Sequence, residues 1–301
     1  MRIVIRTDAS FTIGSGHVMR CLTLADALQK YAEIVFVCRK FPGHMQEVIV
    51  KRGYEVFLLQ KPSEEYLMQD DDLTHAAWLG VSWSHDANET IDKIGDAQVD
   101  WLVVDHYGID FRWHNKLRRL IKKLFVVDDI ADRKLDCNLL LDQTFGRLAS
   151  NYNSIVSPNC VKLIGAKYAL LRPEFAKHRL TAIEKRKNPL GISQILITMG
   201  GSDPDNVTGK VLEGLNLLNW NTPLIIDVIL GGNSLHIDAV KKLASNHRFS
   251  VSVFNNVSNM AERMLLADLA IGAGGSTSWE RCCLGLPALT TLNAENQTEI
   301  I

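Results

Sequence analysis

Short runs rich in β-branched residues alternate with longer segments of helical period along most of the chain. In the first half, a Gly-containing loop and a helix from about residue 17 to 30 follow the first of these runs. The runs that read as strands are residues 2–6, 34–38, 55–59, 101–105 and 124–129. This alternation predicts an α/β fold with parallel sheets and crossover helices. Two of the strands end on carboxylates, Asp105 and Asp129, so we expect function at the carboxyl edge of the sheet.

The second half repeats the pattern, with strands expected at residues 194–199, 224–230, 249–254 and 269–271. We therefore predict two Rossmann-like doubly wound domains, residues 1–175 and 190–301, facing a cleft that binds a small ligand. A linker is expected over residues 173–191, with the charged residues 184–187 as solvated surface. Residues 60–88 read as a solvated insertion over one sheet edge, in which Trp78 and Trp83 are candidates to cover a ligand.

Composition limits the classes of function. The 301 residues are 47% hydrophobic, with 33 basic against 34 acidic side chains, which predicts two buried cores and no bulk attraction to nucleic acid or anionic lipid. No run approaches the roughly 18 apolar residues of a membrane span, and the N-terminus reads as a strand rather than a signal peptide, so we expect a cytoplasmic protein. The six cysteines show no CxxC spacing and are expected to be reduced and buried, without zinc. We expect neither a metal nor a cofactor, and the sequence does not specify an oligomeric state.

The first chemical motif is Gly14-Ser15-Gly16-His17, which follows a strand and opens a helix as phosphate-binding turns do. A dinucleotide site would need a third glycine where Met19 stands and an acidic residue where Arg39 follows the second strand, so that interpretation is disfavoured. The positive end of the helix disfavours an imidazolium at His17, and a neutral imidazole there suits a general base. The alternative is that His17 only caps its helix or bonds within the loop.

Two further glycine turns lie in the second half, each after a strand and before a helix. The first contains Gly200, Gly201 and Ser202, and the second contains Gly275, Ser276 and Thr277. Free amides at such helix starts bind anions, and the Ser276 and Thr277 hydroxyls add donors for a diphosphate. Glu280 lies one helical turn further, where a carboxylate accepts both hydroxyls of a ribose. The alternatives are purely structural turns and, for Glu280, a complement to the helix dipole.

With these motifs in view, the second half resembles the nucleotide-binding domain of GT-B glycosyltransferases of the MurG type. The matching residues are Gly200-Gly201-Ser202 and, between residues 256 and 297, Gly274-Gly275-Ser276-Thr277, Glu280, Gly285-Leu286-Pro287 and Asn296-Gln297. Three further segments point to one family among proteins with this fold. They are residues 6–22, Val104-Asp105-His106-Tyr107 and residues 170–175. Over nearly its whole length the chain is similar to the PseG family, hydrolases of pseudaminic acid biosynthesis, which supplies flagellin glycosylation.

The resemblance implies metal-independent hydrolysis of UDP-2,4-diacetamido-2,4,6-trideoxy-β-L-altropyranose to the free sugar and UDP, with inversion. By this likeness His17 is the base that activates water and Tyr107 lies in the substrate site. Glu280 holds the ribose, and Gly275, Ser276 and Thr277 hold the diphosphate. The other expected substrate-binding residues are Asp8, Gly14, Gly16, Gly200, Gly201, Ser202, Asn296 and Gln297. Asp8 is expected to orient His17, to meet a sugar hydroxyl, or to cap its own loop.

Other functions stay open at this point. A GT-B glycosyltransferase would use the same UDP-sugar donor and differ only in that an acceptor hydroxyl, rather than water, attacks. A non-catalytic UDP-sugar-binding protein and a Rossmann oxidoreductase are weaker alternatives. In GT-B proteins a C-terminal crossover helix follows the Asn-Gln pair, and this sequence ends at Ile301, five residues after Asn296. We therefore expect the second domain to lack that helix in this sequence.

Overall fold

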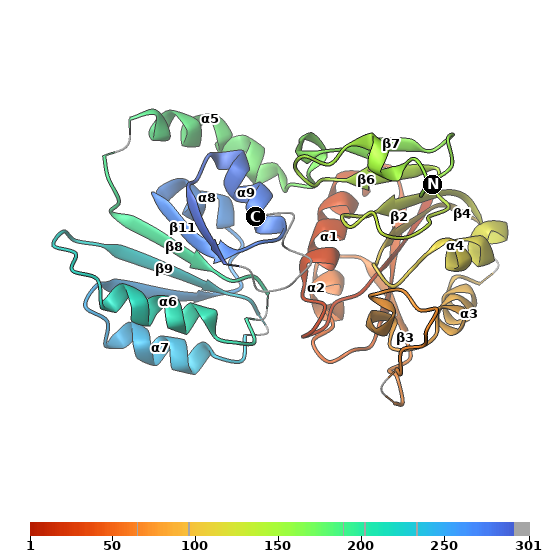
Figure 1. Ribbon diagram of the computed structural model, residues 1–301, viewed down its shortest axis with the longest axis horizontal. Coiled ribbons are helices and arrows are strands. Elements are labelled where there is room, and N and C mark those ends of the chain that lie inside the picture. The colour runs from red at the N-terminus through yellow and green to blue at the C-terminus, as the bar shows by residue number, and fades with distance from the viewer. Residues whose placement is uncertain (65, 96, 189, 202, 233, 292–301) are drawn as a thin grey trace. The chain divides into compact units, whose positions relative to one another are not determined.

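The chain forms two α/β units (Figure 1). The computed structural model describes residues 1–64, 66–95, 97–188, 190–201, 203–232 and 234–291. The boundary between the two units falls between Leu170 and Leu171. Each unit is built on one parallel sheet, as the alternating pattern predicts. In the parts that the structure describes, no helix is both long and apolar enough to cross a membrane.

The first unit contains a seven-stranded sheet in the order β3-β2-β1-β4-β5-β6-β7. Its strands are β1 (Arg2–Thr7), β2 (Glu33–Arg39), β3 (Glu55–Leu59), β4 (Val99–Asp105), β5 (Ile121–Val127), β6 (Leu139–Asp142) and β7 (Val161–Ile164). Its helices are α1 (Gly16–Leu28), α2 (Gln46–Lys51), α3 (Trp83–Ile94) and α4 (Phe111–Leu117), with short 3₁₀ turns at Ala76–Leu79, Arg118–Leu120, Ala149–Tyr152 and Ala166–Tyr168. The chain winds outward from β1 to β3 and then returns to place β4 on the other side of β1. The loops after β1 and β4 therefore diverge at a topological switch point, the usual place for a ligand in such sheets.

Both faces of this sheet are buried, because successive strand residues point to opposite sides. Ile3 and Ile5 join the apolar cluster beneath α1 and α2, whereas Val4, between them, joins the cluster beneath α3 and α4. The same alternation recurs in β4, where Val103 and Val104 belong to different clusters. Burial on both faces explains why these strands read as continuous apolar runs in the sequence.

The second unit contains a five-stranded sheet in the order β10-β9-β8-β11-β12. Its strands are β8 (Gln194–Thr198), β9 (Ile225–Leu230), β10 (Ser250–Asn255), β11 (Leu269–Ala273) and β12 (Ala288–Thr291). Its helices are α5 (Pro173–Lys187), α6 (Val207–Asn216), α7 (Ile237–Ser245), α8 (Met260–Leu266) and α9 (Ser276–Leu284). Helices α6 and α7 cover one face, and α5, α8 and α9 cover the other (Figure 1). The switch point of this sheet lies between β8 and β11.

The segment expected as a linker is mostly the helix α5. A proline at its first position suits a helix start, and Phe175 is fully buried against α8 and α9. The basic residues at its end are not merely solvated, because Lys185 and Arg186 donate to the last carbonyls of α8. Cations at a helix C-terminus satisfy carbonyls that lack helical partners.

Two other expectations also differ from the structure. Residues 60–88 are not wholly a solvated insertion, because Ala76 and Leu79 are buried and α3 begins at Trp83. All six cysteines are free, as expected, but Cys282 is exposed and Cys283 is only half-buried. The remaining cysteines, Cys21, Cys38, Cys137 and Cys160, are buried.

The buried His114 on α4 makes the stability of the first unit depend on pH. Its Nδ1 accepts the backbone N–H of Asp136 at 3.2 Å, and burial lowers its pKa from 6.5 to about 3. Between these two values the unfolded chain binds one more proton than the folded one. Unfolding is therefore favoured as the pH falls below 6.5.

We predict that His114→Asn flattens the acid side of the stability profile. An amide oxygen can accept the same N–H but does not titrate, so the slope should fall by up to about 1.4 kcal/mol per pH unit. Urea unfolding measured between about pH 4.5 and 7.5 tests this. The matched control is His85→Asn, because the His85 side chain is 60% exposed. An unchanged slope for His114→Asn would contradict the assignment.

Candidate functional site

A tight turn after β1 positions His17 at the switch point of the first sheet. Ser10 Oγ accepts the backbone N–H groups of Thr12 and Ile13 at 3.2 and 2.9 Å. Gly14 adopts a φ of +80°, which favours glycine, and donates its N–H to the carbonyl of Ser10. Helix α1 then begins at Gly16, with no acidic residue in its first turn, and His17 is its second residue.

A buried carboxylate at the end of β4 fixes the His17 ring. Asp105 Oδ1 lies 2.6 Å from His17 Nδ1, and His17 is only 8% exposed. Because an ionised carboxylate only accepts hydrogen bonds, this contact favours the tautomer that carries its proton on Nδ1. Among the residues that the structure describes, His17 Nε2 has no hydrogen-bond partner. The ring thus offers a lone pair on one side while Asp105 holds the other, as in enzymes that use histidine as a base.

Arg20 completes the fixation from the next turn of α1. It donates to both oxygens of Asp105 at 2.6 Å and also pairs with Asp129, which follows β5. Burial alone would raise the pKa of Asp105, but the charge of Arg20 and the hydrogen bonds from Arg20 and His17 outweigh it and hold the pKa well below its usual range. Asp105 is therefore a permanent carboxylate. It was not among the expected site residues, although a strand ending in Asp beside β1 was a signal for it.

Three aromatic side chains pack together beside His17. Tyr107 lies edge-on to His17 with ring centroids 4.7 Å apart, and Trp78 stacks on Tyr107 at 5.5 Å and 27°. Trp78 also meets His17 edge-on at 5.9 Å and His75 at 4.8 Å. The Tyr107 hydroxyl donates to Asp129 at 3.0 Å, and burial followed by the Asp129 charge raises the pKa of the phenol. Tyr107 thus lies beside His17. Trp78, a candidate to cover a ligand in the sequence analysis, and His75, which was not predicted, form a wall beside these two rings.

Asp8 does not orient His17. It is fully buried, accepts the backbone N–H of Arg39 at 2.6 Å and pairs with Arg6 at 2.7 Å. His106 Nε2 lies 3.3 Å from its other oxygen. The carboxylate therefore ties β1 to the end of β2, and the expected contact with His17 is not formed.

The two glycine turns of the second unit differ in whether their helix amides are free. After Gly200 (φ +88°) and Gly201, Asp203 accepts the N–H groups of Val207 and Thr208 at 2.8 and 3.0 Å, and Asn206 accepts that of Gly209 at 3.2 Å. The first amides of α6 are thus occupied by side chains of its own turn. This turn is a poorer anion site than the sequence suggested.

Helix α9 begins differently. Gly275 precedes it with a φ of +142°, no side chain caps the helix, and its first turn contains no acidic residue. Ser276 and Thr277 are its first two residues, so their amides and hydroxyls lie at the positive end of the helix. Beneath the turn, the buried Arg281 donates to the Ala273 carbonyl and to Ser278. Of the two turns, this one has the properties of an anion site.

Glu280 lies on α9 as predicted, but its carboxylate is already engaged. Arg172, the residue before α5, donates to Glu280 at 3.1 Å and also pairs with Glu174 at 3.1 Å. Burial raises the pKa of Glu280, and Arg172 opposes that rise. A ribose bound by Glu280 would therefore share this carboxylate with Arg172 or replace it.

Three of the expected site residues, Ser202, Asn296 and Gln297, lie outside the described residues. Gly16 opens α1, and a Cβ added to it or to Gly14 would meet no neighbouring atom within 4 Å. Within the described ranges, no group of three or more His, Cys, Asp or Glu side chains is arranged to hold a metal ion.

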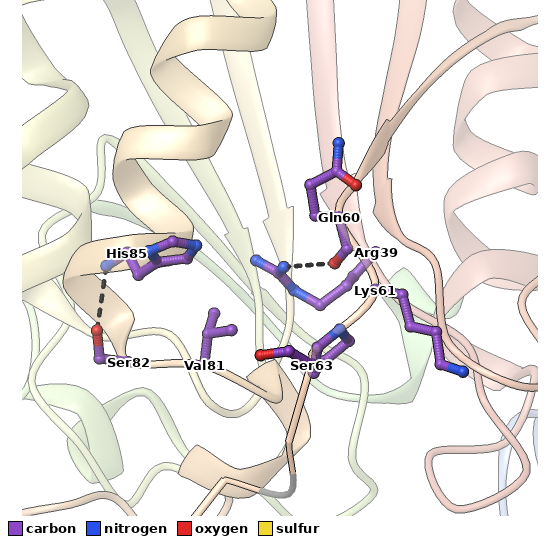
Figure 2. A pocket seen from close by; sticks show the side chains of 8 residues that line it. Arg39, Gln60, Lys61, Ser63, Val81, Ser82 and His85 are labelled. Atoms are coloured by element: carbon purple, nitrogen blue, oxygen red, sulfur yellow. Dashed lines mark hydrogen bonds between the residues drawn. The ribbon is translucent and has the colours of Figure 1, made fainter.

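A surface pocket of about 490 Å³ lies near the ends of β2 and β3 and shares no residue with the His17 cluster (Figure 2). In Figure 2 the Arg39 guanidinium donates to the Gln60 carbonyl, at 2.8 Å, and the backbone N–H of His85 donates to Ser82. Arg39 is fully buried and also pairs with Asp86 and Glu89. We therefore place the candidate chemistry at His17 and not in this pocket.

Comparisons with known proteins agree with this architecture. No protein-family profile matches the chain. It is 30% identical to an uncharacterised protein of Methanocaldococcus jannaschii over 99% of this chain, and it spans 57% of the length of that relative. It is 26% identical to the UDP-2,4-diacetamido-2,4,6-trideoxy-β-L-altropyranose hydrolase of Campylobacter jejuni, over 88% of this chain and 81% of that protein. It is 23% identical to the spore coat polysaccharide biosynthesis protein SpsG of Bacillus subtilis, over 99% of this chain and 79% of that protein.

Comparison with solved structures identifies the fold. MurG of Acinetobacter baumannii matches 99% of this chain and 81% of its own with a TM-score of 0.62 at 14% identity. The calicheamicin glycosyltransferase CalG4 matches the same shares with a TM-score of 0.59 at 13% identity. The fold is that of the GT-B glycosyltransferases. At these identities the likeness extends to architecture and not to activity.

We predict that Asp105→Ala lowers the free energy of unfolding by about 3–5 kcal/mol, because it leaves the buried Arg20 with Asp129 as its remaining carboxylate. Urea unfolding followed by circular dichroism measures the change. The control is Lys187→Ala, which removes an ion pair with Glu184 whose side chains are 61% and 71% exposed. That variant should unfold at the wild-type midpoint. Equal stability of the two variants would contradict a structural role for the buried pair.

Proposed function

We propose that the chain catalyses metal-independent hydrolysis of a UDP-linked 2,4-diacetamido-2,4,6-trideoxyhexose, of altro configuration, to the free sugar and UDP. The observation that carries the proposal is the His17–Asp105 pair. His17 Nδ1 lies 2.6 Å from Asp105 Oδ1, and His17 Nε2 has no hydrogen-bond partner among the described residues. The 26% identity to the Campylobacter jejuni hydrolase supports the substrate class. The free start of α9 supports diphosphate binding by Gly275, Ser276 and Thr277.

The chemistry needs a single base. His17 Nε2 takes a proton from water as the water oxygen forms a bond to the anomeric carbon. The bond from that carbon to the phosphate oxygen breaks, and UDP leaves with the bonding electrons. Because UDP is a stable anion, no acid is needed once amides and hydroxyls neutralise its developing charge. Attack on the face opposite the leaving group gives inversion.

A glycosyltransferase is the second candidate, since the solved structures with this fold include glycosyltransferases. The same base would then take a proton from an acceptor hydroxyl. Proton NMR of the purified protein with the UDP-sugar, in the presence of EDTA, separates the two. Release of free sugar whose first anomer is inverted establishes the hydrolase. UDP release that requires an added acceptor establishes the transferase, and release that EDTA abolishes contradicts the metal-independent mechanism.

We predict that His17→Ala lowers turnover by about 10²- to 10⁴-fold, the usual effect of removing a positioned base. UDP affinity should be unchanged, because the residues proposed to bind the diphosphate lie in the other unit. The measurements are kcat by NMR and Kd for UDP by calorimetry. The control is His85→Ala, an exposed histidine on α3 that should keep wild-type turnover. Comparable turnover in the His17 variant would remove His17 from the mechanism.

A further inference from the structure

The wall beside His17 is held rigidly although it belongs to a long loop. Ala76 and Leu79, which flank Trp78 within the same 3₁₀ turn, are 7% and 1% exposed. Gly80 follows with a φ of +68°, and a Cβ there would lie 2.5 Å from Pro62 and 2.8 Å from Phe41. On the other side, a Cβ on Gly108 would lie 2.8 Å from the His75 carbonyl. Such close packing fixes the position of Trp78 relative to the loop that carries Tyr107.

The exposed part of this wall combines an apolar surface with one polar donor. Trp78 is half-buried, whereas Tyr107 beneath it is 4% exposed. Within the described ranges, the indole N–H of Trp78 has no hydrogen-bond partner. A ring face beside a free donor suits a ligand that has methyl groups and carbonyl acceptors together.

The surroundings of the wall suit an uncharged part of a ligand. Arg20 and Asp129, two charged neighbours of Tyr107, pair with each other. Arg133, 5.8 Å from the Tyr107 ring, pairs with Asp128 and Asp132. Burial lowers the pKa of His75, so this ring is neutral at pH 7. A phosphate would find paired cations here, whereas an acetamido or deoxy group would find ring surface.

From this geometry we infer that Trp78 is a specificity-determining residue, which selects a hexose whose substituents are methyl and acetamido groups over one with free hydroxyls. The inference deepens the proposed function and depends on it. The indole ring packs against the methyl groups, and its N–H donates to an acetamido carbonyl. Loss of the ring therefore weakens binding of the diacetamido sugar more than binding of a simpler UDP-sugar.

Saturation-transfer difference NMR and calorimetry in a His17→Ala background, where the substrate persists, test the inference. The ligands are the UDP-diacetamido-trideoxyhexose and UDP-N-acetylglucosamine. Adding Trp78→Ala should weaken the first about tenfold, and the second by less than about twofold. The methyl signals should decline relative to the uracil signals, while Trp78→Phe retains most of both effects. Tyr31→Ala, which removes a ring that is 71% exposed, is the control and should change neither affinity.

Each result has one meaning. The inference is overturned if the methyl signals and the selectivity survive Trp78→Ala. It is also overturned if the Ala and Phe variants lose affinity for the diacetamido sugar equally, because that result indicates a structural role for Trp78. Absence of uracil signals in the His17→Ala background itself means that the nucleotide does not bind. That result refutes the proposed function and the inference with it, and it is distinguished from the others by the uracil protons alone.

Discussion

The burial of the Asp105 carboxylate is the constraint on which the arrangement of the first unit depends. A carboxylate removed from water is strongly destabilising unless cations and hydrogen bonds replace the lost solvation. Arg20 and His17 do so, and they lie three residues apart, on one face of α1. Their common partner at the end of β4 therefore fixes the rotation of α1 about its axis and its depth over the sheet. The orientation of His17 Nε2 away from this carboxylate is a consequence of the same fixation.

The fold was predictable from the sequence because the central strands are buried on both faces. Residues 55–59 were predicted with the boundaries that the structure shows, and the β1 and β2 segments differ by a residue or two. The short strands β6, β7 and β12 were not predicted, because they have four residues each and lack a long apolar run. Helix α5 was taken for a linker since charged residues dominate its end, and their bonds to the α8 carbonyls are visible only in three dimensions.

Side-chain partners within the candidate site were much less predictable. The sequence singled out His17 and the α9 turn, because each follows a strand at the edge where parallel sheets bind ligands. Tyr107 was added by the resemblance to the PseG family. The sequence left three roles open for Asp8, and orienting His17 was one of them. The structure instead pairs His17 with Asp105 of the neighbouring strand. The sequence also treated the turns before α6 and α9 alike. Only the hydrogen bonds of Asp203 and Asn206 show that the α6 amides are occupied.

The charges at the carboxyl edge of the first sheet indicate which kind of ligand this edge suits. Strand-end carboxylates there are paired with arginines: Asp8 with Arg6, Asp105 with Arg20, Asp128 with Arg133, and Asp142 with Arg147. Guanidinium groups paired with buried carboxylates are poor ligands for a diphosphate. A guanidinium that turned to the diphosphate would leave its buried carboxylate without a partner. The first unit thus suits proton transfer and an uncharged sugar. The start of helix α9 in the second unit suits an anion better, because no side chain caps it and its first turn carries no carboxylate.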